Sequence, residues 1–194
     1  MISALLAVTE GYGEALPIIF LEGSIAMPEC NMDMTGALVE RYERGASEFS
    51  KLMGRVPAKV ASVAAADGGW SVHQTALHIV DAEIVGATRL RMIAAQPGAK
   101  LASYAGDVWG RELAYSKQPL ASAIELFREL RRTTTAMLRL LPSSAWLHRA
   151  EHEETGEVTL QSYLDSHCEH AEIHMREIEA IVKKLTAAHV EREA

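Results

Sequence analysis

The sequence predicts an all-α protein, a four-helix bundle in one domain, and three observations support this prediction. The chain has 194 residues, 48% of them hydrophobic and only 6 of them proline, which is typical of a single helical domain. Apolar residues recur at helical spacing in four long segments, and shorter connections join these segments. No stretch alternates apolar and polar residues convincingly, so we expect no sheet of more than two strands.

The chain begins with an extension whose structure the sequence leaves open. Residues 1–33 precede the predicted bundle, and glycines and prolines break them into short pieces: Gly11, Gly13, Pro17, Gly23 and Pro28. The bundle domain is predicted to cover residues 34–190.

The first two long helices are predicted on either side of a loop. Residues 34–53 carry an amphipathic stripe that includes Tyr42 and Phe49. The second helix is predicted over residues 71–95, with Ser71 as its N-cap, because a serine hydroxyl accepts a hydrogen bond from an otherwise unpaired amide of the first turn.

The second half of the chain holds the other two long helices. A short helix is expected near residues 109–116, and the third long helix spans residues 119–141, beginning at Pro119 and ending before Pro142. The fourth spans residues 159–188, where an apolar stripe advances in steps of four and three: Leu160, Leu164, His167, Ala171, His174, Ile178, Ile181 and Leu185. This spacing is typical of a helix packed in a bundle.

Three histidines, His167, His170 and His174, fall on the predicted fourth helix. Residues four apart lie one turn above each other, so imidazoles from His170 and His174 can converge on one ion. His167 lies about 10 Å from His174 along the helix axis, so these two do not easily share an ion. Spacing alone does not choose between the pairs His167/His170 and His170/His174, and a third ligand has to come from elsewhere.

Several short motifs follow one another in a specific order. The predicted second helix begins at Gly69-Trp70-Ser71-Val72, and His78 and Asp81-Ala82-Glu83 follow. Further along come Asp107 and Trp109, Phe127 to Arg131, Leu141-Pro142 with Trp146, His152 to Leu160, and the His-x3-His of His170 and His174. Over residues 34–185, this order resembles the DinB/YfiT-like superfamily of metal-binding four-helix bundles.

The resemblance implies a metal site. In that family, one histidine from the second helix and a His-x3-His pair from the last helix bind a divalent metal, zinc or nickel, which here makes His78, His170 and His174 the ligands. His167 then becomes a packing histidine beside them. Some family members are thiol-dependent S-transferases, which implies a small-molecule substrate and a low-molecular-weight thiol. A metal-dependent hydrolase and a non-catalytic binding bundle of stress response are the alternatives.

The composition of the chain limits which binding partners and which cellular compartment we expect. The formal net charge is −7 and there is no run of basic residues, which argues against nucleic acid as a partner. The two cysteines, Cys30 and Cys168, are too few for a disulfide framework, which favours a cytoplasmic setting. No stretch approaches the length needed to cross a membrane. We expect a homodimer, because bundles of this kind commonly bury a helix face between two copies.

Some further residues are expected to have ordinary structural roles. Asp81 is expected to orient His78 from one turn away. We expect His148 and His152 to be exposed in a loop, Cys168 to be inert, and Arg131 to lie on a solvated helix face with its basic neighbours Arg128 and Arg132.

Overall fold

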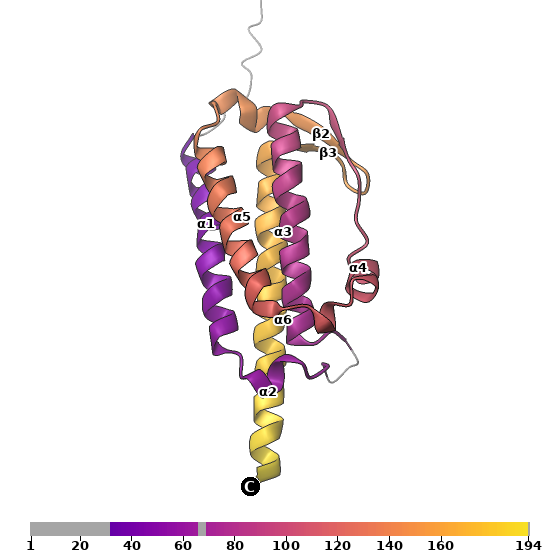
Figure 1. Cartoon of the computed structure of the whole chain (residues 1–194). Coiled ribbons are helices and arrows are strands. Elements are labelled where there is room, and N and C mark those ends of the chain that lie inside the picture. Colours follow the sequence, from indigo (N-terminus) through magenta and orange to yellow (C-terminus); the bar gives the residue numbers. More distant parts are fainter. Residues whose placement is uncertain (1–31, 66–68, 194) are drawn as a thin grey trace, which may run out of the picture.

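Four long helices form the body of the molecule: α1 (Met32–Arg55), α3 (Val72–Ala95), α5 (Leu120–Arg139) and α6 (Leu160–Glu193) (Figure 1). The computed structural model describes residues 32–65 and 69–193, so most of the predicted extension, residues 1–31, lies outside the described residues. Helices α1 and α3 each pack against both α5 and α6. The prediction of a four-helix bundle is confirmed.

The helix ends follow local chemistry. At the start of α3, Ser71 Oγ accepts a hydrogen bond from the Gln74 amide at 3.3 Å, and the Gln74 side chain accepts one from the Ser71 amide at 3.1 Å. This reciprocal capping confirms Ser71 as the N-cap. Helix α6 continues to Glu193, five residues beyond the predicted end at residue 188, because neither Pro nor Gly interrupts that stretch. Its C-terminal end projects beyond the other helices (Figure 1).

Short elements connect the long helices. They are α2 (Ala58–Ala61), α4 (Gly106–Glu112) and the 3-10 helices η1 (Tyr115–Lys117) and η2 (Ser143–Leu147). The single short helix expected at residues 109–116 is therefore α4 followed by η1. None of the helices within the described ranges is both long enough and apolar enough to cross a membrane.

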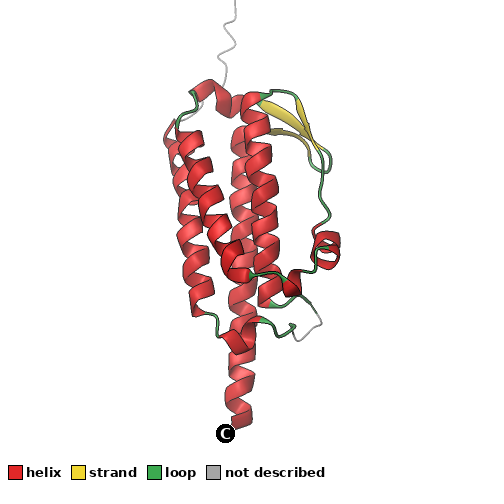
Figure 2. Ribbon diagram, in the orientation of Figure 1, coloured by secondary structure: helices red, strands yellow, loops and turns green. Residues whose placement is uncertain are grey.

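A small sheet at one end of the bundle corrects the expectation of no more than two strands (Figure 2). Strands β1 (Ala99–Leu101), β2 (Arg149–His152) and β3 (Gly156–Thr159) form it in that order. Strand β2 pairs with β1 in parallel and with β3 antiparallel. Each strand has only three or four residues, so an alternating pattern has too few positions to be recognised in the sequence. The class of the fold, mainly helical, is unchanged.

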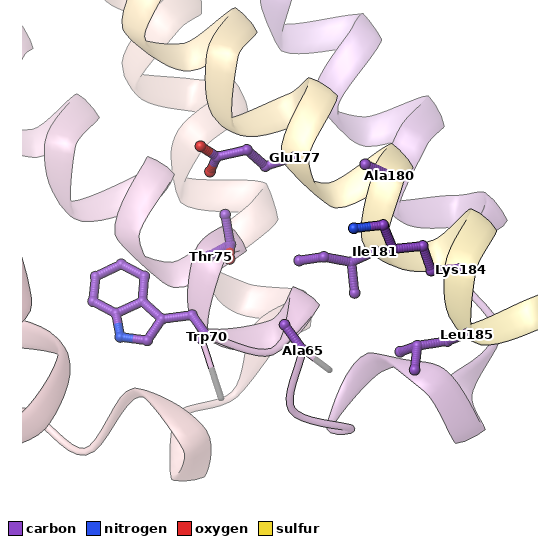
Figure 3. Close-up of a pocket in the computed structure, with 9 residues that line it drawn as sticks. Ala65, Trp70, Thr75, Glu177, Ala180, Ile181, Lys184 and Leu185 are labelled. Carbon is purple, nitrogen blue, oxygen red and sulfur yellow. The ribbon is translucent and has the colours of Figure 1, made fainter. Parts of the chain in front are cut away.

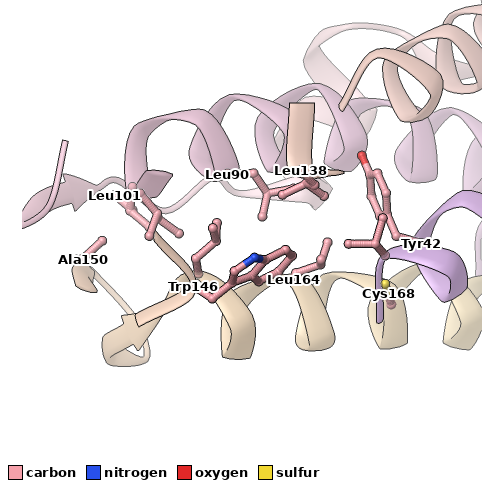
Figure 4. Packing of buried hydrophobic residues seen from close by; sticks show 11 residues of the cluster. Tyr42, Leu90, Leu101, Leu138, Trp146, Ala150, Leu164 and Cys168 are labelled. Carbon is pink, nitrogen blue, oxygen red and sulfur yellow. The ribbon is translucent and has the colours of Figure 1, made fainter. Parts of the chain in front are cut away.

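A layer of buried polar side chains divides the core in two. Figure 4 shows the apolar cluster nearer the sheet, in which Tyr42, Leu90, Trp146 and Leu164 are all less than 5% exposed. A second apolar cluster includes Phe49, Val72, Ile79, Phe127 and Ile178. Between the two clusters lie Glu83 on α3 and Arg131 on α5, and His167, beside Cys168 of the first cluster on α6, joins them; all three are buried.

Candidate metal centre

Three imidazoles meet between α3 and α6. His78 extends from α3, and His170 and His174 extend from consecutive turns of α6. One ring nitrogen from each lies within 4.8 Å of the other two, and the Nε2 atoms of His170 and His174 are 3.2 Å apart. The structure thus joins His170/His174, rather than His167/His170, with His78. Among the described residues, no cysteine or carboxylate joins this group of potential ligands.

Neighbouring side chains fix how two of the imidazoles are turned. Nδ1 of His174 lies 2.7 Å from the carboxylate of Glu177, one turn further along α6. Nδ1 of His78 lies 3.4 Å from the hydroxyl of Tyr104. An imidazole held through Nδ1 presents Nε2 to an ion, which is the usual arrangement around a bound metal.

Aromatic and glycine residues enclose His78. The Trp70 ring lies edge-on to it, with the ring centroids 5.1 Å apart. The backbone of Gly106 passes so close that a Cβ at this position would lie 2.7 Å from Cε1 of His78. The connection that contains Tyr104 and Gly106 therefore packs directly against the imidazole of His78.

The prediction that Asp81 orients His78 is wrong. The Asp81 carboxylate instead accepts a hydrogen bond from the Tyr115 hydroxyl at 2.6 Å. Sequence reasoning missed both residues that do contact the ring nitrogens, Tyr104 and Glu177. Glu177 stands three residues after His174 on the same helix, a spacing that could have indicated it.

Burial keeps two of these imidazoles neutral. Desolvation, followed by the charge of His174, lowers the pKa of His78 to about 4. Desolvation, followed by the charges of His174 and His78, lowers the pKa of His170 to about 3. A neutral imidazole is the form that binds a metal, and three of them suit a divalent zinc or nickel ion. The donor set therefore fits such an ion.

His167 belongs to the buried polar layer. Its Nε2 atom lies 3.1 Å from Glu83 Oε2, and Glu83 also pairs with Arg131 Nε at 2.9 Å. The Tyr42 hydroxyl donates to the same carboxylate. The interpretation of His167 as a packing histidine agrees with this position.

Arg131 corrects a second expectation. Its side chain is only 2% exposed, so it does not lie on a solvated face. Nη1 of Arg131 donates to the Tyr42 carbonyl oxygen at 2.9 Å, and the guanidinium stacks on the rings of Tyr42 and Phe127. Its ion-pair partner Glu83 lies 48 residues away in the sequence, so the local pattern around Arg131 gives no signal of this pairing.

One cavity is lined by His170, and a second is lined by Trp70 and Glu177, which contact His78 and His174. One, of about 320 Å³, is lined by His170 and Tyr104 together with Arg89, His152, Tyr163 and His167. The other, of about 480 Å³, is shown in Figure 3, where Trp70 and Thr75 at the start of α3 lie opposite Glu177, Ile181 and Lys184 of α6. A small molecule has room beside the His170 imidazole in the first of these cavities.

The structure also places His148, His152 and Cys168, for which ordinary roles were expected. His152 is 7% exposed and lies on β2, which corrects the expectation of an exposed loop histidine. His148 is half-buried, and its Nδ1 lies 2.9 Å from the Ala94 carbonyl oxygen. Burial raises the pKa of the Cys168 thiol to about 11, which agrees with the expected inert role.

The sequence and the fold both match known proteins. The model of the DinB superfamily matches residues 41–178. A protein of Bacillus cereus (strain 03BB102) named "Putative metal-dependent hydrolase" is 23% identical over 153 residues, which cover 79% of this chain and 88% of the relative. A Bacillus anthracis (strain A0248) protein of the same name is 22% identical over the same shares of the two chains.

Two solved structures share the arrangement of helices. YfiT from Bacillus subtilis, described as "a probable metal-dependent hydrolase with an unusual four-helix bundle topology", superposes with a TM-score of 0.74 at 18% identity, over 80% of this chain and 89% of that one. A mycothiol-dependent maleylpyruvate isomerase superposes with a TM-score of 0.61 at 14% identity, over 74% of this chain and 60% of the other. At these identities the likeness concerns the fold.

Proposed function

The chain belongs to the DinB superfamily, and from that premise we propose that it is an enzyme dependent on a divalent metal, with His78, His170 and His174 as the ligands of zinc or nickel. One observation carries the proposal: three imidazoles converge beside a cavity, and no fourth potential ligand joins them among the described residues. A structural metal site is normally closed by four protein ligands, whereas a catalytic site keeps a position open.

The residues around the centre have separate tasks in this proposal. When bound, a divalent ion would supply a positive charge that lowers the pKa of a coordinated thiol or water towards neutrality. Glu177 holds the imidazole of His174 in place, and Tyr104 does the same for His78. Trp70 packs against His78 and keeps water from one side of that ring.

We propose that the activated nucleophile is the thiol of a small molecule, which is transferred to an electrophile or forms an adduct with it. Two points support this choice. The cavity beside His170 is large enough for a compound of this kind. The same fold also occurs in an isomerase whose name states its dependence on mycothiol. The second candidate is hydrolysis by water, which the names of the Bacillus relatives favour.

A screen of the metal-loaded protein tests the proposal. Bacillithiol, mycothiol and glutathione are each supplied with generic electrophiles, and esters and amides are assayed separately for hydrolysis. We expect thiol-dependent turnover that His174→Ala abolishes. The control is His73→Ala, because His73 lies on α3 but contacts the Gln118 carbonyl oxygen, away from the three ligands.

Other outcomes of this screen would assign the protein to a different functional class. Turnover of an ester or amide without any thiol would identify a hydrolase. The absence of turnover with every substrate, together with an ion found to have all its positions filled by protein atoms, would identify a non-catalytic binding bundle.

A further inference from the structure

The side chains that line the cavity beside His170 differ in charge from the protein as a whole. The chain carries a formal net charge of −7, yet no aspartate or glutamate is among the described residues that line this cavity, and Arg89 is their one permanently charged side chain. Burial, followed by the charge of Arg89, lowers the pKa of His152, another lining residue. The cavity is therefore a small positive region in an acidic protein.

Arg89 is held in place by neutral partners. Nη1 donates to the Tyr163 hydroxyl at 3.3 Å, and Nη2 donates to the carbonyl oxygen of Ala102. No carboxylate of a described residue forms an ion pair with Arg89, although Arg41, Arg131 and Arg139 each have one. A guanidinium has five N–H donors in a fixed plane, so Arg89 retains both its charge and donor capacity.

The Arg89 guanidinium and the His170 imidazole lie at different ends of this cavity. Tyr163 and His170 both line it from α6, seven residues apart, which corresponds to about 10 Å along the helix axis. His167 lies between these two residues on α6, and its ring is nearly parallel to that of Tyr163, with an interplanar angle of 9° and ring centroids 6.2 Å apart. The cavity thus has a cationic end at Arg89 and a metal-ligand end at His170, joined by aromatic surface.

We propose that this cavity binds a small molecule with a carboxylate, which pairs with Arg89 while the reacting end of the molecule lies at His170. The inference rests on the proposed function and deepens it, because it assigns the class of molecule that the centre uses. The separation of the two ends favours a carboxylate several bonds away from the reacting group. Either the thiol or its electrophilic partner can be the source of the carboxylate.

The test uses the full chain loaded with Co²⁺, since a thiolate bound to cobalt produces a charge-transfer absorbance. In one arm, mercaptopropionate and mercaptohexanoate are titrated beside their methyl esters, so that the carboxylate is on the thiol. In the other arm, hexanoate and methyl hexanoate are titrated calorimetrically with mercaptoethanol present, so that the carboxylate is on a second molecule. The arm in which the acid is preferred identifies the source.

We expect the acid to bind about tenfold or more tightly than its ester in one arm, with mercaptohexanoate ahead of mercaptopropionate if the thiol is the source. Arg89→Gln should remove this preference, and Arg89→Lys should keep part of it. The matched control is Arg91→Gln, because Arg91 lies on the same helix but donates to the Ala87 carbonyl oxygen and Thr134 outside the cavity lining. Cobalt content and thermal unfolding show that each variant is folded.

The failures of the two proposals are distinguishable. If thiols bind cobalt but acids and esters bind equally in both arms, or Arg89→Gln keeps the preference, the carboxylate inference is wrong and the proposed function is unaffected. If no thiol binds cobalt, thiol chemistry is wrong. The hexanoate arm then still decides the inference, because binding that depends on Arg89 supports it and the absence of binding overturns it.

Discussion

The Nε2 atoms of His170 and His174 face each other at 3.2 Å across consecutive turns of α6. This distance suits a hydrogen bond between the two rings, and it also places both Nε2 atoms around a common point at which an ion could bind. His78 reaches the same point from α3.

The first prediction concerns the ligand set. Protein prepared without a histidine tag should contain one equivalent of divalent metal, and the triple variant His78→Ala, His170→Ala, His174→Ala should contain none. His167→Ala should retain the metal, because its imidazole is bound to Glu83 instead. Elemental analysis checks both. Wild-type metal content in the triple variant would contradict the assignment.

The second prediction concerns Glu177, which holds Nδ1 of His174 at 2.7 Å. Glu177→Gln should weaken metal affinity by about tenfold, because a carboxylate that orients a ligand imidazole also raises its basicity. Competition with a chromogenic chelator measures the change. Glu179→Gln, an exposed site on the same helix, is the matched control and should bind like the wild type; equal affinities of the two variants would refute the role of Glu177.

The third prediction concerns pH and the metal-free protein. The folded-state pKa values of His78 and His170 lie at about 4 and about 3, below the value of roughly 6.5 for an unfolded chain. Between these values the unfolded chain binds more protons, so the free energy of unfolding falls as the pH falls from about 6.5 towards 4. Urea titrations of chelator-treated protein measure this slope.

The control for this pH prediction removes the two titrating groups. The double variant His78→Gln, His170→Gln should show a shallower slope over the same pH range. An unchanged slope would assign the effect to other residues.

The fourth prediction uses two glycines of α1. A Cβ at Gly45 would collide with the buried guanidinium of Arg131, whereas a Cβ at Gly36 would meet nothing. Gly45→Ala should destabilise the protein by about 3 kcal/mol or more, because it displaces Arg131 from Glu83. Gly36→Ala should stabilise it by about 0.5–1 kcal/mol. Chemical denaturation measures the free energy of unfolding of both variants. Similar values would show that the Arg131 guanidinium can move aside at little energetic cost.

The sequence predicted the long helices well because each has an apolar stripe of several turns. The four-residue spacing of His170 and His174 showed that these two imidazoles can converge on one ion, but spacing alone did not choose between this pair and His167/His170, and the family resemblance made that choice. His78 was identified through the family resemblance, since no local spacing links it to α6. Tyr104 and the burial of Arg131 escaped prediction. Both depend on contacts between segments that are distant in the sequence, 26 residues apart for Tyr104 and His78, and periodicity within one segment carries no information about such contacts.

The buried layer of Glu83, Arg131 and His167 has a consequence for the proposed metal site. Glu83 stands five residues after His78 on α3, and His167 stands three residues before His170 on α6. Their hydrogen bond therefore fixes the axial register of the two ligand-bearing helices without any ion. In small zinc domains, folding waits for the metal. In the proposed centre, an ion would therefore exchange in a chain that is already folded, and metal supply and ligand preference would decide which ion occupies the site.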